Sequence, residues 1–188
     1  MKLYGSYTSP FVRHCRIALL ETHLECEFIE TDGVASAAKS PTKKVPFFED
    51  GDIFLTDSLA IVKHLRDKAG QPFLRDAQEL DKLCLINTLL DASVFLFLME
   101  KDGITPAQSA YLKRSAARVE SGLAELEKSS LKVNGPYTDV ELRLGCFLAW
   151  AKFRKRFTFD QYPQLTSLVT KLENYAPFAA TPPRLPQA

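Results

Sequence analysis

The chain has 188 residues, of which 46% are hydrophobic and 25% are charged, a composition typical of one large globular domain or two small ones. Its 24 basic and 23 acidic residues give a net charge of +1, so no long-range field should attract nucleic acid or a membrane surface. The four cysteines stand singly, without C-x-x-C spacing, which favours reduced thiols in a cytoplasmic protein and disfavours a metal site.

The first 72 residues alternate between strand-like and helix-like patterns. The predicted elements are a strand at Leu3-Tyr4, a helix over about residues 10–22, a strand over Glu25–Glu30, a hairpin of Val45–Glu49 and Ile53–Leu55, and a helix over Ser58–Asp67. The Ala- and Ser-rich piece Val34–Lys39 is expected to be irregular. Strands interleaved with helices predict an α/β domain with a mixed sheet over residues 1–72.

The remainder of the chain has helical periodicity and no strand pattern. Gly70-Gln71-Pro72 marks the linker, and residues 77–188 are predicted to form an all-helical domain. Its helices begin near Leu80, at Thr105-Pro106, at Thr138 and at Tyr162-Pro163, and the end at Pro182, Pro183 and Pro186 is expected to be unstructured. Thr138 and Glu141 have capping-box spacing, which supports folding rather than chemistry.

Ser9 lies where the first strand turns into the first helix, in the stretch YTSPFVRHCRIALLE of residues 7–21. Serine followed by proline favours a helix start and leaves a hydroxyl at the positive end of the helix dipole. His14, five positions on, should lie off to one side, so a serine–histidine pair is not expected. Two interpretations remain open: Ser9 only caps the helix, or it also donates a hydrogen bond to a bound anion such as a thiolate.

Two further motifs could contact the same ligand. The backbone before Pro46 is held extended, so Val45 could offer its N–H and carbonyl to a peptide-like ligand. At Thr56-Asp57-Ser58 a helix begins, where a ligand carboxylate could bind the free amides and its ammonium could pair with Asp57. Taken singly, an ordinary strand-edge proline and an ordinary helix cap are the favoured explanations of these residues. Together with Ser9 they fit a small peptide that carries a thiol and an amino-acid end.

The motifs resemble those of the soluble, cytosolic-type glutathione S-transferases, over nearly the whole chain. Ser9-Pro10-Phe11 followed by Arg16-Ile17-Ala18-Leu19 is similar to the S-P-F…R-[VI]-x-L start of the serine-type, bacterial-like members. Lys44-Val45-Pro46 matches the family's K-V-P, whose proline is cis. Asp57-Ser58 with Ala60-Ile61 resembles the family's E-S-x-A-I.

The resemblance implies a thioredoxin-like N-terminal domain with a mixed four-stranded sheet, an all-α C-terminal domain, and transfer of glutathione to a small hydrophobic electrophile. Ser9 would stabilise the thiolate, and the Val45 backbone would pair with the cysteine of glutathione beside Pro46. Lys44 would reach the glycine carboxylate, and Asp57 and Ser58 would hold the γ-glutamyl end. A cytoplasmic homodimer with glutathione as co-substrate and without a metal is expected.

Some residues depart from the family pattern. Asp57 is one methylene shorter than the usual Glu, and Ser40–Lys43 stands where N-P-x-G is common. Tyr7 is a rival hydroxyl for the thiol, because other classes use a tyrosine near the first strand. Because of the shorter Asp57 and the altered loop, a non-catalytic or regulatory binding protein on the same fold stays an alternative. A glutathione-dependent thiol reductase ranks lower, because serine replaces the cysteine that it needs at the helix start.

The electrophile is expected to bind over Ser9, against an apolar wall in the helical domain. The candidates for that wall are Phe95, Phe97, Met99, Tyr111 and Phe153. Aromatic residues at helical spacing are also the usual material of a bundle core, so this assignment competes with ordinary packing.

Overall fold

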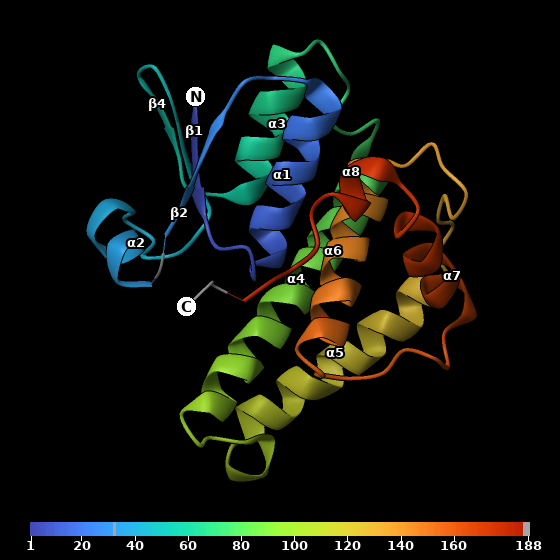
Figure 1. The fold of residues 1–188 in the computed structure, drawn as a ribbon. Helices are drawn as coiled ribbons and strands as arrows, with labels where there is room; N and C mark the ends of the chain where they lie inside the picture. Colours follow the sequence, from blue (N-terminus) through green and yellow to red (C-terminus); the bar gives the residue numbers. More distant parts are fainter. Residues whose placement is uncertain (32, 186–188) are drawn as a thin grey trace. The chain divides into compact units, whose positions relative to one another are not determined.

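The computed structural model describes residues 1–31 and 33–185 (Figure 1). By its contacts the chain divides into two compact units, Met1–Arg75 together with the chain from Leu172 onward, and Asp76–Lys171. The division into domains at residues 1–72 and 77–188 stays a prediction. In the contacts of the structure, the last stretch of chain groups with the first unit rather than with the helices that precede it.

The first unit contains a mixed four-stranded sheet with strand order β2-β1-β3-β4. The strands are β1 (Lys2–Gly5), β2 (Glu27–Glu30), β3 (Phe47–Asp50) and β4 (Ile53–Leu55), and the helices are α1 (Pro10–Thr22), α2 (Gly33–Lys39), α3 (Ser58–Lys68) and α8 (Ala176–Ala179). β1 pairs with β2 in parallel and with β3 antiparallel, and β3 pairs with β4 antiparallel. The predicted α/β class and mixed sheet are confirmed.

One prediction for this unit is wrong. Residues expected to be irregular form the helix α2, Gly33–Lys39. The run Ala35-Ser36-Ala37-Ala38-Lys39 is rich in strong helix formers, and the buried Ser36 hydroxyl donates to the Gly33 carbonyl at 3.1 Å. Figure 1 shows α2 on the opposite side of the sheet from α1 and α3.

The core of the first unit lies between the sheet and the helices α1 and α3, which pack side by side. Its fully buried members are Leu3, Cys15, Ala18, Phe48, Ile61, Val62 and Leu65. Each buried Leu, Ile, Val or Phe side chain contributes about 1.5–3 kcal/mol relative to an exposed one. At the end of β1, a Cβ added to Gly5 would meet the Val12 side chain at 2.5 Å. Strand and helix therefore approach closely, which fixes the start of α1.

The regular elements of the second unit, over the described residues 76–171, are all helical. It holds α4 (Ala77–Lys101), the 3₁₀ turn η1 (Pro106–Gln108), α5 (Ala110–Lys128), α6 (Asp139–Phe153) and α7 (Pro163–Leu172), whose last residue groups with the first unit. α4 packs against both α5 and α6. Thr105-Pro106 begins only the short turn, because Ser109 supplies a second cap and its hydroxyl accepts from Leu112 N–H to start α5.

Other local signals are confirmed, in this unit and near the end of the chain. The Thr138 hydroxyl accepts from Val140 N–H at 3.3 Å, and Glu141 accepts from Thr138 N–H at 2.9 Å, so the capping box forms at the start of α6. Residues 181–185 have no regular structure, as predicted for Pro182 and Pro183, while Pro186 lies outside the described residues.

Helix α4 is the longest and among the most apolar elements in the described part of the chain. By length and composition alone it could cross a membrane, with a mean hydropathy of 1.7 over 18 residues. Core helices of globular proteins share these properties, so one such helix is weak support for a membrane span.

Candidate functional site

The three motifs singled out in the sequence meet at one edge of the sheet. β1 and β3 are antiparallel with Tyr4 opposite Phe47, so the end of β1 lies beside the start of β3. β3 and β4 are antiparallel with Phe48 opposite Leu55, so the end of β4 lies at the same edge. Ser9 follows β1, Val45-Pro46 precedes β3, and Asp57-Ser58 follows β4. Topology therefore gathers residues far apart in the chain.

Ser9 caps α1, as the first interpretation requires. Its Oγ accepts a hydrogen bond from Val12 N–H at 3.3 Å, and Pro10 occupies the first turn. A hydroxyl that accepts a hydrogen bond keeps its own proton for donation. Capping is thus compatible with donation to an anion at the positive end of this 13-residue helix. The geometry leaves both interpretations of Ser9 chemically open.

Neither His14 nor Cys15 can act beside Ser9. Both side chains are fully buried in the first unit. The Cys15 thiol lies 3.7 Å from the Ser58 carbonyl oxygen. The side-chain hydrogen bond of Ser9 goes to Val12, and among the described residues no histidine shares it. A serine–histidine pair and a surface thiol nucleophile at this helix start are therefore both absent from residues 1–31 and 33–185.

Val45 and Pro46 directly precede β3 and form the rim of the candidate site at this edge of the sheet. The Val45–Pro46 peptide bond is cis, as the family resemblance implied, and Pro46 is buried while Val45 is half-buried. In the described part of the chain no backbone hydrogen bond engages the Val45 N–H or carbonyl. Both groups are therefore free to pair with an extended peptide. Lys44 is exposed beside them.

The loop before this rim keeps a glycine-like shape without glycine. Lys43 stands at the position of the family's glycine and has φ of +52°, in the left-handed region that glycine favours. Its N–H donates to the Ser40 carbonyl at 2.9 Å. The buried Ser40 hydroxyl lies 2.9 Å from that of Thr42. These bonds hold the turn although the lysine costs about 1–2 kcal/mol in this conformation.

Asp57 caps α3, and Ser58 is its first residue. Asp57 Oδ1 accepts from Leu59 N–H at 2.7 Å and from Ala60 N–H at 3.3 Å. The other carboxylate oxygen has no hydrogen-bond partner among the described residues, and the side chain is exposed. Ser58 is buried. Asp57 can therefore cap the helix with one oxygen and meet a ligand ammonium with the other.

Tyr7, the rival hydroxyl, is surrounded by cations. Its ring packs on Phe28 with centroids 4.8 Å apart, the Arg16 guanidinium lies 4.6 Å from its centroid, and that of Arg184 lies 3.8 Å from it. Cation–π contacts of this kind hold a ring in place. Tyr7 is therefore a packed group at the same end of α1, and the geometry does not choose between its hydroxyl and that of Ser9.

The C-terminal segment is the part of this unit that the sequence reasoning missed. The buried Arg13 of α1 donates to the Phe178 carbonyl at 2.9 Å and lies 3.7 Å from the centroid of its ring. Tyr175 donates its hydroxyl hydrogen bond to Glu21 at the other end of α1. An arginine on the apolar face of α1 was the available signal, because a buried guanidinium requires a partner.

The predicted apolar wall lies on helices of the second unit and is not buried. Phe95 and Tyr111 are exposed and meet edge to face at 6.4 Å. Phe97 is half-buried against Trp150, and the Arg154 guanidinium lies 5.1 Å from the Phe97 centroid. Burial lowers the pKa of Arg154 from its ordinary value. Met99 and Phe153 are also half-buried. These residues are not core residues of the bundle, so they stay available as candidates.

Within residues 1–31 and 33–185, no group of three or more His, Cys, Asp or Glu side chains is arranged to hold a metal ion.

Comparison with known proteins shows which domain family the first unit is similar to. Residues 3–73 match the family model described as the glutathione S-transferase N-terminal domain. Ser9, Val45 and Asp57, which meet at the sheet edge described above, all lie within the matched residues.

Relatives and solved structures extend the likeness to the whole chain. A probable glutathione S-transferase of rice, GSTF2, is 33% identical over 119 residues, 60% of this chain and 52% of that protein. The chain thus spans about half the length of this plant relative. YibF of Escherichia coli, a GST-like protein, is 29% identical over 97% of this chain and 98% of its own. A glutathione S-transferase from Methylobacillus flagellatus, solved with GSH bound, superposes with a TM-score of 0.84 at 24% identity, covering 97% and 99% of the chains. The chain has the glutathione S-transferase fold.

Proposed function

We propose that this protein is a serine-type, bacterial-like glutathione transferase that conjugates glutathione to a small hydrophobic electrophile. The observation that carries the proposal is the convergence of Ser9, the free Val45 backbone and Asp57 at one sheet edge. The match of residues 3–73 to the glutathione S-transferase N-terminal domain supports it independently. A cytoplasmic homodimer, as is usual in the family, is part of the same proposal.

Glutathione would lie extended along this edge. The Val45 N–H and carbonyl would pair with its cysteinyl backbone, and Lys44 would meet its glycine carboxylate. The γ-glutamyl carboxylate would bind the amides at the start of α3, at Ser58, and the ammonium would pair with the free oxygen of Asp57. Pro46 would shape the rim. Each contact uses a group that the protein itself leaves accessible or that begins a helix.

The thiolate would be stabilised at the start of α1 without a catalytic base. A thiol pKa lowered by two units corresponds to about 2.7 kcal/mol. A hydrogen bond from the Ser9 hydroxyl supplies about 1.5–3 kcal/mol, and the helix dipole about 0.3–1 kcal/mol. The proton leaves to solvent, the sulfur forms a C–S bond with the electrophilic carbon, and the leaving group departs with the bonding electrons.

Calorimetry and two activity assays test the proposal together. Glutathione should bind with a dissociation constant between micromolar and low millimolar, and a chlorodinitrobenzene should be conjugated with release of chloride. Absence of detectable glutathione binding would refute the proposal and favour a non-catalytic scaffold. Disulfide reduction faster than conjugation would favour a thiol reductase instead, against the burial of Cys15.

A further inference from the structure

The helical unit contains a cavity of about 430 Å³ that the proposed glutathione chemistry does not use. It lies between the second half of α4, the turn η1, the middle of α5 and the chain after α6. Its lining residues are Ser93, Leu96, Glu100, Pro106, Ala116, Val119, Glu120, Leu123, Arg156, Phe157, Thr158, Gln161 and Tyr162. All belong to Asp76–Lys171, and neither the predicted glutathione residues nor the predicted apolar wall is among them. Its volume falls within the range of small-molecule sites.

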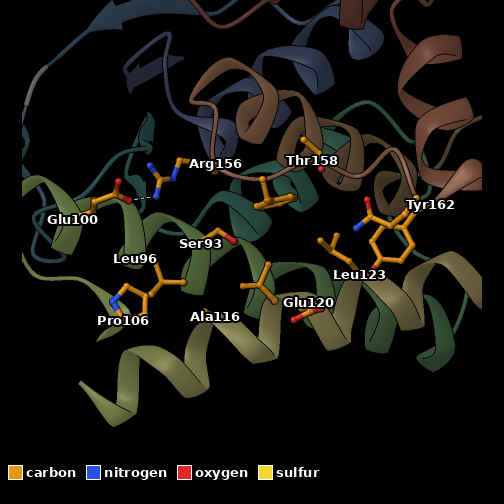
Figure 2. A pocket seen from close by; sticks show the side chains of 13 residues that line it. Ser93, Leu96, Glu100, Pro106, Ala116, Glu120, Leu123, Arg156, Thr158 and Tyr162 are labelled. Carbon is orange, nitrogen blue, oxygen red and sulfur yellow. Dashed lines mark hydrogen bonds and ion pairs between the residues drawn. The ribbon is translucent and has the colours of Figure 1, made fainter. Parts of the chain in front are cut away.

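Ser93 places a hydroxyl group that lacks a hydrogen-bond partner in the lining of this cavity. Its side chain is only 4% exposed, and its Oγ has no hydrogen-bond partner. A serine or threonine inside a helix commonly bonds the carbonyl four residues back, as Thr88 of the same helix does to Cys84 at 2.9 Å. Figure 2 shows the Ser93 hydroxyl directed into the space between α4, α5 and the segment that carries Thr158. An unpaired buried hydroxyl costs about 1–3 kcal/mol, so a ligand that satisfies it gains affinity.

The surroundings of Ser93 select the kind of molecule. Leu96, Val119 and Leu123 make apolar walls, and aromatic rings fill such walls well. At the rim, Arg156 is ion-paired with Glu100, as Figure 2 shows. Glu120 is exposed and has no partner among the described residues. The rim therefore carries a net negative charge, which disfavours an anion. A neutral hydroxyl on an aromatic ring can donate to Ser93 and accept from it.

We infer that this cavity is a second small-molecule site, separate from the glutathione site, for an uncharged phenol of about two fused rings that hydrogen-bonds Ser93. A 150 Å³ cavity holds about one benzene ring, so about 430 Å³ accommodates a bicyclic body. The site needs no glutathione and no contact with the first unit.

Three matched probes test the inference by calorimetry on the full-length protein, with and without glutathione. 2-Naphthol should bind in both conditions, about three- to tenfold more tightly than naphthalene, since one neutral hydrogen bond is worth about 0.5–1.5 kcal/mol. 2-Naphthoate should bind more weakly than 2-naphthol. The Ser93→Ala variant should bind 2-naphthol and naphthalene equally. Ser115→Ala, a buried serine outside the lining, should keep the preference.

A blocking variant locates the site. Ala116→Phe places a ring in the cavity from α5 and should abolish 2-naphthol binding while glutathione binding is unchanged. If this variant fails to fold, Ser93→Leu, which fills the cavity from α4, replaces it. The inference is overturned if 2-naphthol does not bind wild type, if Ser93→Ala keeps the preference, or if binding survives a folded blocking variant. If wild type binds 2-naphthol but does not bind glutathione, the proposed function is refuted and this inference stands.

Discussion

Replacing Ser9 tests the thiolate site most directly. In Ser9→Ala the bound thiol loses the hydroxyl donor but keeps the dipole of α1, so its pKa should rise only part of the way to the solution value. A hydrogen bond to a charged group is worth about 1.5–3 kcal/mol, which corresponds to about one to two pKa units. Glutathione affinity should change by only a few-fold, because the Val45 and Asp57 contacts remain.

The same substitution also removes a helix cap, and this second effect can be separated from the first. Ser9 accepts from Val12 N–H at 3.3 Å, and loss of such a cap to alanine costs about 0.5–2 kcal/mol of stability. Glycine is a tolerated cap and costs only a few tenths of a kcal/mol. Ser9→Gly and Ser9→Ala should therefore raise the thiol pKa equally, while only Ser9→Ala lowers the free energy of unfolding appreciably.

Ultraviolet titration of the bound thiolate measures the pKa, and urea unfolding measures the stability. Tyr7→Phe is the control, since it removes the rival hydroxyl and keeps the ring beside Arg16 and Arg184. The thiol pKa of glutathione bound to Tyr7→Phe should equal that of glutathione bound to wild type. An unchanged pKa in both Ser9 variants, or a rise in Tyr7→Phe alone, would refute the assignment of Ser9.

Three further substitutions probe the first unit. Asp57→Asn should keep the α3 cap, since Asn and Asp cap equally well, yet weaken glutathione binding in calorimetry; loss of turnover with unchanged affinity would contradict the assigned role. Hydrogen bonds lower the pKa of Asp50, the bond from Lys68 more than the bond from His64. The ionised Asp50 therefore stabilises the fold above the unfolded-state pKa of about 3.9, and this stabilisation is lost as pH falls through the folded-state pKa. Asp50→Asn should accordingly be less stable than wild type at pH 7, and chemical denaturation should show the difference shrinking in acid; a difference independent of pH would rule this out. Lys43→Gly should raise the free energy of unfolding by up to about 1 kcal/mol, because relief of the left-handed strain exceeds the added chain entropy; Lys43→Ala should show no such gain, and equal effects of the two would argue against strain at φ +52°.

The sequence by itself determined the local structure of the site's helices. The caps at Ser9, Asp57 and Thr138 could be predicted because capping depends on residues only two or three positions apart. The hairpin at Asp50-Gly51 could be predicted for the same reason, since its turn residues are contiguous. The α/β order and the helical second half followed from hydrophobic periodicity, which the sheet and helices confirm.

Only the tertiary structure decided which of these features share a place and which groups lack a partner. Strand pairing brought Ser9, Val45 and Asp57 to one sheet edge, and in β1 and β3 it joins residues as far apart in the chain as Lys2 and Glu49. Arg13 was joined to Phe178 by folding across 165 positions. Ser93 looked like any helix serine until packing of α4, α5 and the chain after α6 buried it beside a cavity. Local propensity acts within a turn of the chain, whereas burial and hydrogen-bond satisfaction depend on neighbours that only the fold supplies.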